Sequence, residues 1–182
     1  SLEYALAAGE DALARFSNAE AARHYGYVLG AVSEMPEYAG ERTRALEGLG
    51  DALSASDLFV EALKKFEELS SVADSGVVKL RALRKAHFCS YWRGDRAHSH
   101  ELAAKADEYA QFDRLEYARL RLYRGFVAGR ELRTKEAVED EEAALTVFEE
   151  EFSLRDVAAA LAEIVFITNW EVAIEVKLAA AL

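Results

Sequence analysis

The sequence predicts an all-α protein built from antiparallel helix pairs, and three observations lead to that prediction. Hydrophobic residues make up 52% of the 182 residues, which is enough for a continuous core. Alanine, leucine, glutamate and arginine are frequent, and all four favour helices over strands. A single proline, Pro36, leaves the remaining segments free to form uninterrupted helices.

The first predicted helix pair spans about residues 2–34. Gly9 and Ala12 are small or apolar residues on its first helix. Ser17 and Glu20 have the spacing of a capping box, which predicts the start of the second helix. That second helix carries Ala21, Tyr25 and Val28 on one face.

The second predicted pair, about residues 42–70, has the clearest pattern. Gly50 and Ala62 are small and lie where two helices would cross closely. Large apolar residues surround them at helical spacing: Leu46, Leu49, Leu53, Phe66 and Leu69. This segment therefore predicts two short amphipathic helices that face each other across a tight turn.

The third predicted pair spans about residues 78–108. It turns at Gly94-Asp95, where Asp95 is a suitable helix cap. Its second helix carries Ser99, Ala103 and Ala106. The pattern again predicts a helix, a tight turn and a second helix.

The fourth and fifth predicted pairs span about residues 114–150 and 153–182. The fourth combines a stripe on one helix with apolar positions on the next: Leu115, Ala118, Leu122, Gly125 and Gly129, then Ala137, Ala144 and Phe148. In the fifth, Ser153 and Asp156 predict a helix start, and a turn is expected near Thr168-Asn169. The fifth pair ends on an apolar segment from Val176 to Leu182.

The pattern of Leu46, Leu49, Gly50, Leu53, Ala62, Phe66 and Leu69 resembles the tetratricopeptide repeat. The resemblance implies a right-handed α-solenoid of about five helix pairs, forming a single domain over residues 1–182 of a longer chain. It places His87 where the family prefers a small residue. The predicted pairs begin roughly 36 to 40 residues apart, against ~34 in the standard repeat. Such stretched repeats resemble the regulatory helical arrays of large signalling ATPases and transcription regulators.

The charge distribution is uneven along the chain. The net charge is −11, which disfavours binding to nucleic acid or to anionic membrane surfaces. Residues 79–135 nevertheless carry 14 lysines and arginines against 7 acidic residues, while the segments before and after are strongly acidic. An acidic protein can therefore still present a basic central surface.

In the tetratricopeptide family the first helix of each pair lines a concave groove that holds partner peptides. The resemblance then implies that the following residues face or border the groove: Arg81, Arg84, Lys85, Phe88, Tyr91 and Trp92, with Arg119, Tyr123, Phe126 and Arg130 in the next pair. Basic groups would pair with partner carboxylates, and aromatic rings would cover apolar side chains. The alternative is that these cations are solvated or offset by carboxylates elsewhere in the chain.

The sequence carries no recognisable catalytic or metal-binding motif. His87 and Cys89 are two positions apart on a predicted helix, so they point in different directions and would not hold one metal ion together. We find no phosphate-binding loop and no nucleophile elbow. The acidic run 139–142 is interpreted as a solvated helix face because it lacks the ligand spacing of an EF-hand. We therefore expect neither enzymatic activity nor a cofactor.

These observations lead to one main functional hypothesis. The chain is expected to be a non-catalytic, cytoplasmic scaffold that binds a protein or peptide segment, including an acidic one. The cytoplasmic expectation rests on the single cysteine and on the lack of a recognisable signal peptide. Two alternatives remain open: a sensor domain for a ligand or peptide in a larger regulator, and an oligomerisation module that self-associates through the apolar C-terminal helix.

Overall fold

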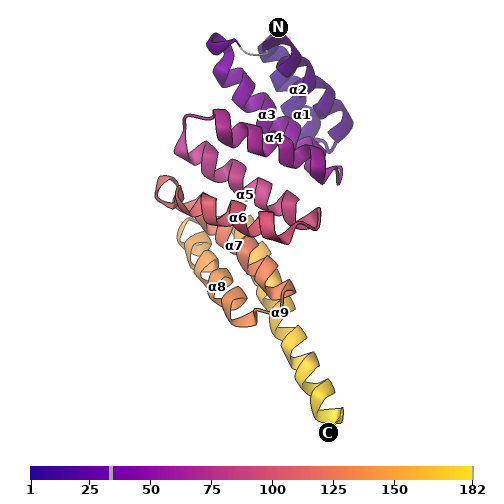
Figure 1. Ribbon diagram of the computed structural model, residues 1–182, viewed down its shortest axis with the longest axis vertical. Coiled ribbons are helices and arrows are strands. Elements are labelled where there is room, and N and C mark those ends of the chain that lie inside the picture. The colour runs from indigo at the N-terminus through magenta and orange to yellow at the C-terminus, as the bar shows by residue number, and fades with distance from the viewer. Residues whose placement is uncertain (33–34, 182) are drawn as a thin grey trace. The chain divides into compact units, whose positions relative to one another are not determined.

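The protein is α-helical throughout the residues that the structure describes (Figure 1). The structure is a computed structural model that describes the backbone of residues 1–32 and 35–181 and the side chains of 1–32, 35–167 and 169. These residues form nine α-helices and two short 3₁₀ helices, η1 (Pro36–Tyr38) and η2 (Ala110–Phe112). The α-helices are α1 (Leu2–Ala14), α2 (Asn18–Val32), α3 (Ala39–Ser54), α4 (Phe59–Val72), α5 (Gly76–Trp92), α6 (Arg96–Asp107), α7 (Arg114–Arg130), α8 (Thr134–Glu150) and α9 (Leu154–Ala181).

The chain divides into an N-terminal part, Ser1–Phe112, and a C-terminal part, Asp113–Leu182. In the N-terminal part each of the helices α1 to α6 packs against the next, and α1 also contacts α3. In the C-terminal part α8 packs against both α7 and α9, and α7 contacts α9. Within each part, sequential helices are antiparallel neighbours, which confirms the coarse architecture that the sequence predicts.

Glycines allow the two helices of a pair to cross closely. A Cβ atom added to Gly50 of α3 would lie 2.5 Å from the ring of Phe66 on α4, well inside van der Waals contact. A Cβ atom on Gly9 of α1 would lie 2.8 Å from the ring of Tyr25 on α2. The crossing predicted at Gly50 and Ala62 is therefore confirmed, with Phe66 fully buried over the glycine.

The turns within successive pairs share one backbone conformation. Each contains a residue with positive φ: Phe16 (59°), Asp57 (59°), Gly94 (91°) and Leu132 (61°). The residue that follows donates its N–H to a carbonyl five positions earlier, as in a Schellman motif: Ser17 to Ala12 (2.8 Å), Leu58 to Leu53 (3.0 Å), Asp95 to Ser90 (3.1 Å) and Arg133 to Ala128 (2.9 Å). The predicted Gly94-Asp95 turn is confirmed, and the Asp95 carboxylate accepts the N–H of His98 as a cap.

The predicted fifth pair is wrong, because α9 continues through Thr168 and Asn169 as one helix from Leu154 to Ala181. No glycine or proline occurs between residues 153 and 182, and Thr and Asn reduce helix propensity by less than about 1 kcal/mol. Nothing in this segment therefore forces a turn. Residues 33–34 of the first predicted pair, and the apolar side chains after Asn169, lie outside what the structure describes.

Candidate partner-binding surface

Two of the predicted groove cations lie on α5 and form ion pairs with α3. The guanidinium of Arg81 donates to both carboxylate oxygens of Glu47, at 2.5 and 2.7 Å. The ammonium of Lys85 lies 2.8 Å from Glu47 and 2.7 Å from Asp51. These cations are compensated inside the chain, as the alternative interpretation of the basic segment expects.

The pKa values of Glu47 and Asp51 are shifted in opposite directions at these ion pairs. Burial opposes ionisation of Glu47, but hydrogen bonds from Arg81 and Lys85 outweigh burial and hold its pKa below the ordinary value. Burial raises the pKa of Asp51 even though Lys85 is close. Glu47 is thus the firmer anchor for both cations, and an acidic partner would have to compete with it.

The same kind of ion pair joins α1 to α3, which the sequence analysis missed. Arg44 of α3 pairs with Glu3 at 3.2 Å and with Glu10 at 2.8 Å. Arg44–Glu10, Arg81–Glu47 and Lys85–Asp51 each join residues 34 positions apart. A search for opposite charges at that separation would have found all three.

An aromatic cluster lies where the end of α5 meets the start of α4. Phe59 of α4 stacks on Trp92 at 6.3 Å between ring centroids, and Phe88 meets Trp92 edge-on at 6.0 Å. Tyr91 also contacts Trp92 at 5.8 Å. Trp92 keeps 48% of its surface exposed, and Leu58 beside Phe59 keeps 46%. We call these four rings, Phe59, Phe88, Tyr91 and Trp92, the aromatic cluster.

Arg84, the third predicted cation of α5, is buried, with 9% of its surface exposed. It therefore does not present a guanidinium to solvent as the groove hypothesis expects. The predicted residues of α5 are thus three cations, of which Arg84 is buried, and three rings. The rings provide the accessible apolar surface among them.

The predicted residues of α7 lie in the C-terminal part. Arg119 donates to Asp156 of α9 at 2.8 Å and to Glu116 at 2.5 Å. The guanidinium of Arg130 stacks on the ring of Phe126 at 3.3 Å and lies 3.4 Å from Glu163 of α9. Tyr123 is half-buried. The α7 cations therefore hold α9, as the α5 cations hold α3.

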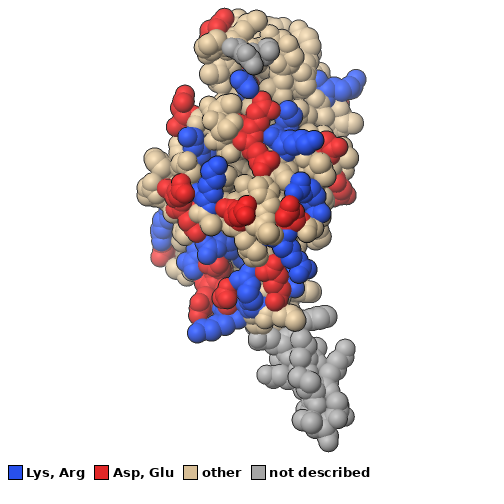
Figure 2. Space-filling model, viewed as in Figure 1, with Lys and Arg blue, Asp and Glu red and all other residues tan. Residues whose placement is uncertain are grey.

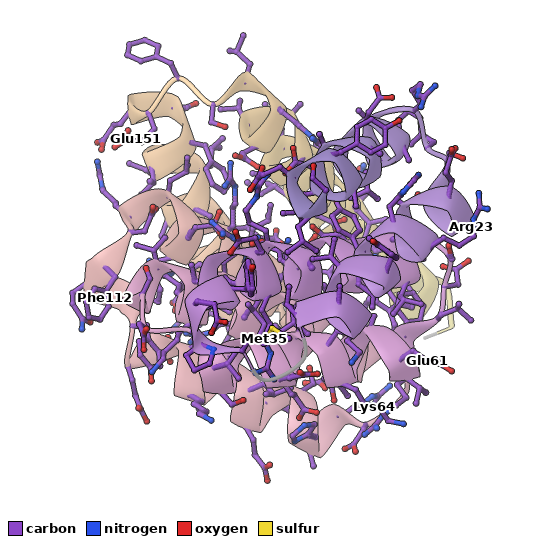
Figure 3. The ribbon with its side chains drawn as sticks, turned by 90° about the horizontal axis from the view of Figure 1, so that it is seen from above. Arg23, Met35, Glu61, Lys64, Phe112 and Glu151 are labelled. Atoms are coloured by element: carbon purple, nitrogen blue, oxygen red, sulfur yellow. The ribbon has the colours of Figure 1, made fainter. Side chains whose placement is uncertain are left out.

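Basic and acidic side chains are consequently interspersed, as the face shown in Figure 2 illustrates. Even-numbered helices also carry exposed charges. Figure 3 shows Arg23 of α2, and Glu61 and Lys64 of α4, projecting outward. The excess positive charge of residues 79–135 does not form a uniform basic surface on the face in view.

A cleft of ≈ 310 Å³ lies between α4 and α6. Its residues are Glu67, Ser70, Ser71, Leu83, His98, Glu101, Leu102 and Lys105. A hydrogen bond with Glu67 at 2.7 Å raises the pKa of His98. The hydroxyls of Ser70 and Ser71 donate to carbonyls of their own helix, so neither is aligned as a nucleophile toward His98.

His87 and Glu141 are among the buried polar groups that were not recognised as such from the sequence. His87 of α5 places Nδ1 2.7 Å from the hydroxyl of Ser99 on α6. Glu141 of α8 is fully buried, and neither of its carboxyl oxygens has a hydrogen-bond partner among the described residues. The prediction that the run 139–142 is a solvated face is therefore wrong at Glu141, although Glu139 and Glu142 are exposed.

The described residues contain no cluster of three or more His, Cys, Asp or Glu that would hold a metal ion. Burial raises the pKa of the Cys89 thiol to about 11, which disfavours a reactive thiolate. Within the part that the structure describes, no helix has the length and apolarity needed to cross a membrane.

Comparison of the sequence with protein-family models and with curated proteins finds no match. The functional proposals therefore rest on the geometry of the chain itself.

Proposed function

We propose that the chain is a non-catalytic, tetratricopeptide-like helical repeat that binds a segment of a partner protein through the aromatic cluster of α4 and α5. The observation that carries the proposal is the partly exposed cluster itself. Rings that are held in place by one another and still accessible provide large contact area at low entropic cost, and such residues dominate binding energy in protein interfaces.

Two features support the repeat assignment. The positive-φ turns within the first four helix pairs, at Phe16, Asp57, Gly94 and Leu132, are 37 to 41 residues apart, somewhat longer than the ~34 residues of a standard tetratricopeptide unit, and a further turn of this kind at Phe152 joins α8 to α9. Ion pairs at a separation of 34 residues join α1 to α3 and α3 to α5. A right-handed solenoid would use such contacts between successive first helices to set its curvature.

The ion pairs also bear on the partner's chemistry. A purely acidic segment would displace Glu47 or Asp51 from the cations that they already hold, and it would gain little net energy from that exchange. A segment with a large apolar side chain needs no such exchange when it covers Trp92. The proposed partner therefore supplies an apolar anchor, with an acidic segment as the weaker alternative.

A peptide-display library selected against the full chain tests the proposal. We expect selected peptides to contain an aromatic or large aliphatic residue and to lose at least tenfold in affinity on Trp92→Ala. Tyr27→Ala is the matched control, because Tyr27 is an aromatic residue 63% exposed on α2. Peptides that bind the Trp92→Ala variant as well as the original chain would contradict the proposal.

Self-association is a second candidate, favoured by one observation on α9. Leu154 is 79% exposed and Leu161 is 46% exposed, and these residues lie on one side of the helix. Light scattering over a concentration series would detect a dimer, and Leu161→Glu should dissociate it. A monomer at all concentrations would exclude this candidate.

A further inference from the structure

Glu141 occupies a position that aromatic residues fill in the first two helix pairs. Tyr25 lies four residues after Ala21 and covers Gly9, and Phe66 lies four residues after Ala62 and covers Gly50. Glu141 likewise lies four residues after the buried Ala137 of α8.

The geometry over the glycine is also equivalent. A Cβ atom added to Gly125 of α7 would lie 2.6 Å from Cγ of Glu141 and 3.2 Å from its Oε1. The carboxyl group is thus packed against the α7 backbone in a space that takes an aromatic ring elsewhere in the chain. Such a space excludes water, so a charge there is poorly solvated.

The charged groups around Glu141 come from all three helices of the C-terminal part. On α7, Arg130 attracts the carboxylate, but its guanidinium is already engaged by Phe126 and Glu163. On α9, Glu163 repels the carboxylate. On α8, Asp140 also repels it, though Arg121 and Arg124 of α7 lie 2.7 and 3.5 Å from Asp140 and offset that charge.

Arg130, Glu141 and Glu163 therefore form a group of one cation and two carboxyls. With both carboxyls ionised the group carries a net negative charge, and one bound proton makes it neutral. Burial, the largest effect, and the nearby Glu163 together raise the pKa of Glu141 to about 7. The proton is thus exchanged near neutral pH.

This group lies at the junction where α9 meets the other two helices. Ile167 of α9 packs with Ala137 of α8, and a Cβ atom on Gly129 of α7 would lie 2.7 Å from Cδ1 of Ile167. Glu163 is one helical turn before Ile167 on α9, and Glu141 is one turn after Ala137 on α8. Repulsion between the two carboxyls consequently acts at the contact that holds α9.

We propose that Glu141 is a proton-binding site that controls how firmly α9 packs against α7 and α8. With the proton bound, the junction is neutral and closed. When the proton is lost, the buried charge of Glu141 and the charge of Glu163 favour separation of α9 from the α7–α8 hairpin. Protonation of Glu141 changes the helix packing of the C-terminal part. It does not require the partner-binding role of the aromatic cluster.

Hydrogen exchange of the intact chain, followed by mass spectrometry at pH 5.5 and pH 8.5, tests the proposal. After correction for the intrinsic exchange rate, we expect peptides from α8 and from the first half of α9 to lose protection on the order of tenfold or more at the higher pH. Peptides from α1 to α4 provide the internal reference and should change little. Equal changes in both sets would overturn the proposal.

Variants then assign the effect to the carboxyl. Glu141→Gln should abolish the difference between the two pH values, whereas Glu142→Gln, its exposed neighbour on α8, should preserve it. If the Glu141→Gln chain does not fold, Glu163→Gln provides the second test. It removes the repulsion and releases Arg130 to pair with Glu141, so the pH effect should shrink. A full effect in Glu163→Gln would contradict the proposed mechanism.

Discussion

The helix crossing of the second pair and that of the fourth pair use the same backbone arrangement with opposite side-chain chemistry. Phe66 covers Gly50 with an apolar ring, and Glu141 covers Gly125 with a carboxyl group that has no hydrogen-bond partner among the described residues. Burial stabilises the first crossing at every pH. The second is stabilised only when a proton is bound, because an uncompensated buried charge is costly. Equivalent positions of two helix pairs can therefore carry either an apolar ring or a titratable group.

At the equivalent crossing of the third pair, the large side chain is polar and hydrogen-bonded. His87 replaces the glycine on the first helix, and Ala103 stands four residues after Ser99, where the other pairs have a large side chain. In this pair the large residue, His87, is on the first helix and the small residue is on the second. The Ser99 hydroxyl forms hydrogen bonds with the imidazole and with the carbonyl of His87. Each of these crossings thus combines one large and one small residue, while the polarity of the large residue varies.

The largest effect is expected at the apolar crossing. Phe66→Ala removes a fully buried ring and leaves a cavity against Gly50, so it should lower the free energy of unfolding by about 3–5 kcal/mol. Urea denaturation followed by circular dichroism measures this loss. The loss should be similar at pH 5.5 and pH 8. A marked pH dependence would show that the crossing is not purely apolar.

A substitution at the crossing of the fourth pair is expected to stabilise the chain. Glu141→Met keeps the side-chain length and removes the charge, so it should raise the free energy of unfolding at pH 8 by about 2 kcal/mol. The gain should shrink at pH 5, because the raised pKa of Glu141, about 7, means that the original chain is already protonated there. The same denaturation series measures it. A destabilised Glu141→Met chain at pH 8 would mean that the carboxyl is satisfied.

Substitutions in the turns should change the free energy of unfolding by about 1 kcal/mol. Gly94 has φ of 91°, so Gly94→Ala should destabilise the chain by about 1 kcal/mol. Phe152, between α8 and α9, holds a φ of 54° with its ring 86% exposed. Phe152→Gly should therefore stabilise the chain by about 0.5–1 kcal/mol. Thermal unfolding measures the change in stability that each substitution causes. If both substitutions changed stability in the same direction, the two turns would not share one backbone geometry.

The smallest effect is expected at the ion pairs of α1 and α3. Arg44 is partly exposed, and exposed ion pairs contribute little, so Arg44→Ala should change the free energy of unfolding by less than about 1 kcal/mol. High salt should reduce the effect further. Urea denaturation at two salt concentrations checks this prediction. A loss above 2 kcal/mol would make these ion pairs a main source of stability.

Local patterns predicted much of the fold and little of the site. The spacing of Gly50, Ala62 and Phe66 predicted a close crossing, since helical periodicity alone brings those residues to one face. The turn at Gly94 could also be predicted, because glycine is a strong turn residue. The turns at Phe16, Leu132 and Phe152 could not be predicted, because bulky residues rarely adopt positive φ. The predicted turn at Thr168-Asn169 failed because those residues are only weak helix breakers.

The candidate site depends on contacts between distant residues, which a single sequence does not reveal. The compensation of Arg81 by Glu47 required the packing of α5 on α3. Glu141 was hidden in an acidic run, but a local signal existed. It lies four residues after Ala137 and three before Ala144, on the apolar stripe of the same helix. Its acidic neighbours on both sides, Asp140 and Glu142, masked that periodicity.

The most direct test of the account is the pKa of the Glu141 carboxyl in the intact, unmodified chain. Carbon-13 NMR of the glutamate side-chain carboxyls over pH 4 to 9, assigned with Glu141→Gln, measures it without any assumption about unfolding. We expect the Glu141 signal to titrate near pH 7. A Glu141 signal that titrates below pH 5 would contradict the account, because the carboxyl would then be solvated or paired.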